Sequence, residues 1–158
     1  MSQWWRRGSK AGDQRTLLCV QSQRSQRSQA MVGRVTWSVE DADSGRPFID
    51  FRCSGVLGDR EIAEAFDVVV NQARQRNLWH ILADLRELKG GQTVFDLYGF
   101  VKTLASVNAT GAFREAVVRP IDVEGADLVE FWETAARNRG LNVQTFNDRQ
   151  SAIDWLSK

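Results

Sequence analysis

The chain has 158 residues, of which 42% are hydrophobic and 26% are charged, and its formal net charge is +1. This size and balance are typical of one soluble domain with a buried core. No apolar run is long enough to cross a bilayer, and Cys19 and Cys53 form no disulfide or metal-binding pattern. The composition argues against a membrane span, a zinc site and a disulfide-rich scaffold, and it favours the cytoplasm.

The first thirty residues differ from the rest of the chain in charge and complexity. Residues 1–30 contain six basic residues and one acidic residue, a net charge of +5, whereas the 15 basic and 19 acidic residues of 31–158 give −4. The polar repeat at 23–29 offers nothing to bury. We therefore expect a disordered basic tail at 1–30, with Met31 as the true start of the protein, and one domain over 31–158. The acidic domain is a poor match for nucleic acid.

Two strands are predicted at the start of this domain. Apolar and polar residues alternate over 35–40 and again over 49–54, the period of a strand with one buried face. Turn-forming residues at 41–45 separate the two segments. The two strands are therefore predicted to pair as an antiparallel hairpin.

Helices and buried strands alternate after the hairpin. Helical spacing of apolar residues predicts four helices: 59–76 with Asp59 as its cap, 93–106, one from 128 that stops at Gly140, and a last one that starts at Asn147 or Asp148. A short apolar run at 78–83 predicts a strand covered on both faces, 116–118 predicts another buried strand, and 143–146 predicts the last strand. The order β-β-α-β-α-β-α-β-α predicts an α/β fold, a mixed sheet with an antiparallel N-terminal hairpin and helices on its faces.

The usual catalytic and nucleotide-binding motifs are missing from the sequence. It contains no glycine-rich phosphate cradle and no nucleophile elbow. His80 is the only histidine and falls inside a predicted strand, where Ser-His-Asp catalysis does not place it. A hydrolase or a metalloenzyme is therefore disfavoured.

Asp84 and Arg86 follow the buried run at 78–83. In open α/β sheets, ligands gather at the carboxyl ends of parallel strands, so these two side chains are candidates for binding. In the simpler interpretation, Asp84 accepts amide hydrogen bonds in a loop and Arg86 pairs with a nearby acid. The alternative function that they suggest is an enzyme acting on a small anionic substrate, with Asp122 as a third group.

The predicted helix 93–106 offers a second candidate surface. Gly91 and Thr93 belong to a glycine-rich segment at its start, where backbone amides attract anions, although a flexible turn before a capped helix is the simpler interpretation. Phe95 and Phe100 widen the apolar face of this helix beyond what one packing layer needs. Two explanations of this wide apolar face are open. Either the helix is buried on more than one side, or the additional apolar surface covers an apolar ligand or a partner protein.

Four segments carry a resemblance to a known family. Residues 81–86 (Ile-Leu-Ala-Asp-Leu-Arg), 93–102, 131–140 and 152–156 (Ala-Ile-Asp-Trp-Leu) resemble the bacterial SpoIIAA-like proteins of the STAS superfamily, over essentially 31–158. The resemblance implies helices packed mainly on one face of the sheet. It also implies a non-enzymatic protein that binds a protein partner or, like the related Sec14-like proteins, a lipid. The family's phosphorylation switch would fall on Thr93, although the preceding aspartate of its motif is missing here.

The sequence thus predicts a cytoplasmic bacterial binding module, regulatory in role, with no catalytic residue, cofactor or metal. Its partner is expected to be a protein or a lipid-like small molecule, without nucleic acid or a membrane span, and a homodimer is left open. The predicted binding residues are Asp84, Arg86, Gly91, Thr93, Phe95 and Phe100, and Thr93 is also the candidate for phosphorylation.

Overall fold

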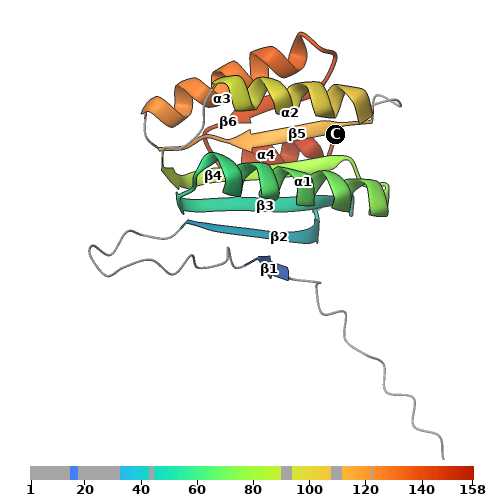
Figure 1. Ribbon diagram of the computed structural model, residues 1–158. Coiled ribbons are helices and arrows are strands. Elements are labelled where there is room, and N and C mark those ends of the chain that lie inside the picture. Colours follow the sequence, from blue (N-terminus) through green and yellow to red (C-terminus); the bar gives the residue numbers. More distant parts are fainter. Residues whose placement is uncertain (1–14, 18–32, 43–44, 90–93, 108–111, 122) are drawn as a thin grey trace, which may run out of the picture.

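The computed structural model describes residues 15–17, 33–42, 45–89, 94–107, 112–121 and 123–158 (Figure 1). The strands within these ranges are β1 (Arg15–Leu17), β2 (Arg34–Asp41), β3 (Pro47–Val56), β4 (His80–Lys89), β5 (Arg114–Val118) and β6 (Asn142–Phe146). The helices are α1 (Asp59–Arg76), α2 (Val94–Val107), α3 (Val123–Arg137) and α4 (Arg149–Leu156). From β2 onward, the predicted order of strands and helices is confirmed.

The strands form one mixed sheet in the order β1-β2-β3-β4-β5-β6. Strand β2 is antiparallel to both of its neighbours, β1 and β3. Strands β3, β4, β5 and β6 run parallel to one another. The predicted N-terminal hairpin is therefore confirmed as β2 and β3. Strand β1 comes from the segment expected to be a tail, and its residues pair with β2 at the edge of the sheet, Arg15 opposite Trp37. The domain limit at residue 31 stays a prediction.

The helices of the described residues lie on both faces of the sheet, three on one and one on the other. Figure 1 shows α1, α2 and α3 in front of the strands and α4 behind them. The larger core lies under α1, α2 and α3 and includes Ile81, Val101 and Trp132. A smaller core under α4 includes Leu82 and Ala152. The expected arrangement, with helices mainly on one face, is confirmed. None of the described helices is both long and apolar enough to pass through a membrane.

The ends of the helices follow from local residues. Gly58, not Asp59, is the N-cap of α1, so the predicted cap is wrong by one residue; Asp59 lies in the first turn, where its charge favours the helix dipole. Helix α4 begins after Asp148, whose carboxylate accepts a hydrogen bond from the Ser151 amide at 2.8 Å. This confirms a predicted start. Helix α3 is followed by Gly140, whose φ of 77° suits glycine at a helix stop.

Strand β4 is longer than predicted. The sequence predicts a strand that ends at residue 83, but β4 continues to Lys89 because β3 still offers it a partner, with Val56 opposite Lys89. Strand β5 stops earlier, and its last residue, Val118, lies opposite Asp84. Asp84 and Arg86 therefore lie inside a strand and not in the loop after it, which corrects the prediction.

Candidate functional site

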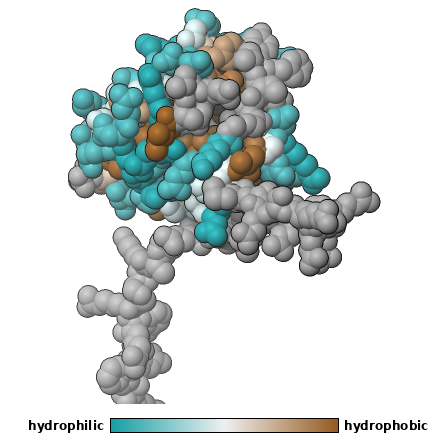
Figure 2. All heavy atoms as spheres, turned by 90° about the vertical axis from the view of Figure 1, so that its left-hand side faces the viewer, coloured by the Kyte–Doolittle hydropathy of each residue, from teal (hydrophilic) through white to brown (hydrophobic). Residues whose placement is uncertain are grey.

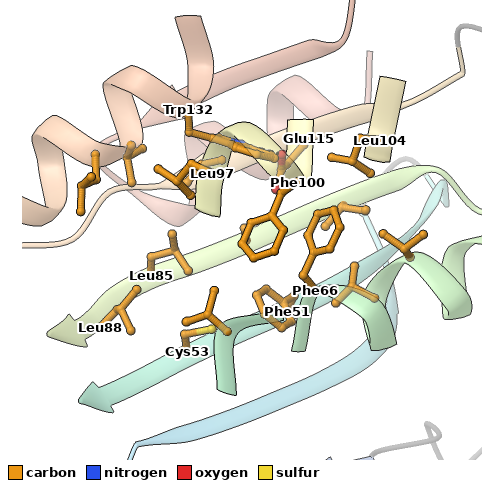
Figure 3. A pocket seen from close by; sticks show the side chains of 18 of the residues that line it. Phe51, Cys53, Phe66, Leu85, Leu88, Leu97, Phe100, Leu104, Glu115 and Trp132 are labelled. Atoms are coloured by element: carbon orange, nitrogen blue, oxygen red, sulfur yellow. Dashed lines mark hydrogen bonds between the residues drawn. The ribbon is translucent and has the colours of Figure 1, made fainter. Parts of the chain in front are cut away.

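A cavity of about 120 Å³ lies between the sheet and the three helices that cover its front face (Figure 3). The described residues that line it are apolar except for the carboxyl group of Glu115, the thiol of Cys53 and the indole N–H of Trp132. The sheet contributes Phe51, Cys53, Ile81, Ala83, Leu85, Leu88, Glu115 and Val117, and the loop before β5 adds Phe113. Helices α1, α2 and α3 contribute Ile62, Phe66, Val69, Val70, Leu97, Phe100, Leu104, Leu128, Val129 and Trp132.

The alternation of side chains along β4 explains where this space comes from. Ile81, Ala83 and Leu85 point to the same face because successive strand residues face opposite sides. Ala83 lies between Phe51 and Val117 in the register of the sheet. Its methyl group fills little of the space under the helices, so a small residue in the central strand leaves room beneath α1, α2 and α3.

Phe100 forms part of the cavity wall. Its ring stacks on Phe66 of α1 with centroids 4.4 Å apart and an angle of 19° between the planes, and both rings line the cavity (Figure 3). Phe100 thus contacts a second helix and an apolar space, and its role in binding a ligand or a partner stays a prediction. The side chain of Phe95, its predicted companion, lies outside the described residues.

Glu115 is the only acidic residue among those that line the cavity. The indole Nε1 of Trp132 donates a hydrogen bond to its Oε2 at 2.9 Å, and Figure 3 shows Trp132 reaching from α3 to this carboxyl group. Burial raises the pKa of Glu115 from 4.5 to about 7, although the hydrogen bond from Trp132 acts in the opposite direction. The residue is half-buried, and its side chain borders the cavity.

The sequence prediction missed Glu115, although a signal was present. Phe113, Glu115 and Val117 alternate along the chain, so in a strand they point to one face. Phe113 and Val117 are apolar and buried, and the face that they share with Glu115 is the core face. The predicted strand at 116–118 did not include Glu115, because it began two residues after the true start of β5 at Arg114.

Cys53 lies in the same lining but is not suited to nucleophilic chemistry. Burial raises the pKa of its thiol to about 12. A thiol with this pKa stays protonated at neutral pH, whereas a reactive cysteine needs the thiolate. Cys53 therefore acts as a small apolar group in the wall of the cavity.

Asp84 and Arg86 lie on the opposite face of the sheet, so the structure does not bring them together with Phe100. Arg86 donates from Nε to Asp84 Oδ1 at 2.9 Å and from Nη2 to Oδ2 at 2.7 Å. Burial opposes the ionisation of Asp84, but the hydrogen bonds and charge of Arg86, with the charge of Arg149, hold its pKa below the usual value. The two predicted binding residues thus form an ion pair with each other.

A second buried carboxylate, Asp50, lies beside this pair. Arg149, the first residue of α4, approaches Asp50 Oδ1 at 2.6 Å, Glu40 at 3.1 Å and Asp84 at 3.8 Å. Arg52 approaches the other oxygen of Asp50 at 2.6 Å. The side chain of Asp50 is only 2% exposed, yet both of its oxygens have an arginine partner. We call these residues, with Asp84 and Arg86, the arginine-carboxylate network; it attaches α4 to the sheet.

The remaining predicted site residues, Gly91, Thr93 and Asp122, lie outside the described residues. In the part of the chain that the structure describes, no group of three or more His, Cys, Asp and Glu side chains is placed to hold a metal ion. Comparison with known proteins gives no family model and no curated protein that matches the chain. The function must therefore be argued from the chain's own residues.

Proposed function

We propose that the protein is a non-catalytic binding module that takes up the apolar part of a small molecule in the cavity and holds a polar group of that molecule at Glu115. The observation that carries this proposal is a carboxyl group to which, among the described residues, Trp132 alone donates a hydrogen bond, in a cavity whose described lining is otherwise apolar apart from the Cys53 thiol. Burying a carboxyl group with few partners is unfavourable, because protein atoms replace its water. Such a group is common where it serves binding or chemistry.

The volume of the cavity limits the size of the ligand part that it holds. An engineered protein cavity of roughly 150 Å³ binds benzene, and the cavity under α1, α2 and α3 is about 120 Å³. A single ring or a short branched alkyl group therefore fits inside. A lipid-like molecule satisfies the proposal only if the rest of its chain extends beyond this cavity.

Glu115 favours some polar groups over others. Its Oε2 accepts the hydrogen bond from Trp132, and its Oε1 can accept a bond from a ligand. A protonated amine gains most, because it pairs with the ionised carboxylate in surroundings of low dielectric constant. A hydroxyl group gains a neutral hydrogen bond, and a carboxylate is repelled once Glu115 is ionised.

Three compounds with the same ring test the proposal: toluene, benzyl alcohol and benzylamine. Thermal unfolding and calorimetric titration of the wild type at pH 8 are expected to show binding of all three, with benzylamine the tightest by about tenfold. Ala83→Leu, which fills the cavity, is expected to abolish binding of all three. Glu115→Gln is expected to keep toluene binding and to remove the preference for the amine.

Glu87→Gln is the matched control, since Glu87 is an exposed glutamate of the same strand as Ala83 and its loss is expected to leave all three affinities unchanged. Two results would contradict the proposal. One is that none of the compounds raises the melting temperature or releases heat at saturating concentration. The other is that a folded Ala83→Leu variant binds all of them as the wild type does.

The absence of catalysis is part of the proposal. Its support is that Asp84 and Arg86 form an ion pair with each other. An enzyme that used these residues on an anionic substrate would need Arg86 free to bind it. Membership of the SpoIIAA-like proteins and binding of a protein partner stay hypotheses based on the resemblance. The cavity proposal depends on neither.

A further inference from the structure

Three basic side chains gather at the amino ends of the parallel strands, on the face that α4 covers. Arg46 directly precedes β3, His80 is the first residue of β4 and Arg114 is the first residue of β5. His80 and Arg114 are opposite each other in the register of the two strands, so their side chains share a face of the sheet. This end of the sheet lies on the right-hand side of Figure 1.

Arg114 is held in place by an aromatic ring. Its guanidinium carbon lies 4.0 Å from the ring centroid of Trp155 in α4, and Trp155 in turn contacts Phe146 with centroids 5.8 Å apart. This cation–π contact fixes the plane of the guanidinium group but satisfies none of its N–H donors. The Nε of Arg114 is buried and has no hydrogen-bond partner in the described part of the chain.

The charges around these residues have the same sign. Burial lowers the pKa of His80, and the nearby charges of Arg46 and Arg114 lower it further. Burial and the charge of Arg46 likewise lower the pKa of Arg114. Among the described residues, the charged groups that shift the pKa values of His80 and Arg114 are thus cations, whereas the arginines of the arginine-carboxylate network each have an acidic partner.

We propose that Arg46, His80 and Arg114 form a binding site for an oxyanion of the phosphate or phosphate monoester class. A guanidinium group presents parallel N–H donors that match two oxygens of a phosphate, and the imidazole N–H supplies a third donor from the neighbouring strand. Bound phosphate would offset the repulsion among the three cations. Arg46 is exposed, so an anion can reach the site from solvent.

This site is independent of the cavity, because the sheet separates it from the face under α1, α2 and α3. It also differs from a general attraction of basic surfaces for anions. Residues 31–158 carry a net negative charge, so the domain as a whole does not attract anions. The proposed site is a local group of cations whose positions are set by the register of the strands and by Trp155.

His80 provides a direct probe, because it is the only histidine in the chain. Its imidazole proton signals give its pKa by NMR, and the titration is run at one ionic strength in chloride, in inorganic phosphate and in sulfate. Phosphate and sulfate are expected to raise the pKa of His80 by about one relative to chloride, since a bound anion favours the imidazolium. Identical titration curves in the three salts would overturn the proposal.

Two variants separate the site from general screening by salt. Arg46→Gln and Arg114→Gln are each expected to raise the pKa of His80 in chloride and to remove at least three quarters of the further rise in phosphate. Lys102→Gln, which removes an exposed charge from α2, is expected to change neither value. If the rise in phosphate persists in both arginine variants, the anion is adventitious only and the proposal fails. If Arg114→Gln does not fold, the exposed Arg46→Gln variant alone decides.

Discussion

The two faces of the sheet bury carboxyl groups in opposite ways. Under α4, the oxygens of Asp50 and Asp84 face Arg52, Arg86 and Arg149 at 2.6–3.8 Å. Under α1, α2 and α3, Glu115 has one neutral donor, the indole of Trp132. Burial of a charged residue therefore does not by itself indicate a binding site. The partners of the buried group distinguish a structural ion pair from a candidate for function.

The pKa values express the same difference. The pKa of Asp84 is lowered: burial alone would raise it, but the hydrogen bonds and charge of Arg86, with the charge of Arg149, outweigh burial. The pKa of Glu115 is raised to about 7, since burial dominates there and the hydrogen bond from Trp132 offsets only part of it. Asp84 thus stabilises the fold when ionised, whereas ionised Glu115 destabilises it.

The largest effect is expected from breaking the arginine-carboxylate network. Arg149→Met removes the cation that contacts Asp50, Glu40 and Asp84, and the loss in the free energy of unfolding is expected to be about 3 kcal/mol, since a buried carboxylate loses a partner. Urea denaturation at pH 7 measures it. Arg60→Met serves as the control, because Arg60 forms an exposed pair with Glu64 and is expected to cost less than about 1 kcal/mol. Equal losses in the two variants would contradict the structural role of the network.

A somewhat smaller effect is expected from the ionisation of Glu115. Its pKa is 4.5 without burial and about 7 in the fold, so folding takes up a proton in this range and stability falls as the pH rises from about 4.5 to about 7. In Glu115→Gln this loss is absent. The difference in unfolding free energy between variant and wild type is therefore expected to grow by roughly 2–3 kcal/mol between pH 5 and pH 8. Parallel stability curves would show that Glu115 is not buried as described.

The smallest effect is expected at the start of α4. Asp148→Ala removes the side chain that caps this helix through the Ser151 amide, and a lost N-cap costs about 1 kcal/mol. Urea denaturation measures this loss in stability. Titration with toluene measures whether the substitution also changes binding in the cavity on the other face of the sheet. Because α4 lies on the face without the cavity, toluene affinity is expected to stay within about twofold of the wild type. A large loss of affinity would mean that the two faces are not independent.

Much of the fold was predictable because its signals are local. Alternation over 35–40 and 49–54 indicated the hairpin of β2 and β3, and Asp148 was a predicted start for α4 because an aspartate before a helix can accept an amide hydrogen bond. The length of β4 was not predictable in this way. Its residues beyond 83 are polar in part, and they belong to the strand only because β3 pairs with them after a register shift between Arg52 and Ser54.

The candidate site was harder to predict because it depends on contacts between distant residues. Phe100 was identified from the width of a helix face, but its stacking partner Phe66 lies on another helix. The acidic nature of the cavity depends on Glu115, whose hydrogen-bond partner Trp132 follows 17 residues later. For Asp50 the sequence pattern gave the wrong environment. Alternation over 49–54 predicts a polar, exposed face for Asp50, but in the fold α4 covers this face and Asp50 is buried.

The central claim is that the cavity binds an apolar group next to Glu115. A crystal structure of the protein with benzylamine, at pH 8, tests it most directly. We expect the ring between Phe66, Phe100 and Leu85, and the amine nitrogen within hydrogen-bond distance, roughly 2.7–3.2 Å, of a Glu115 oxygen. An empty cavity, or benzylamine bound only at another surface, would contradict the account.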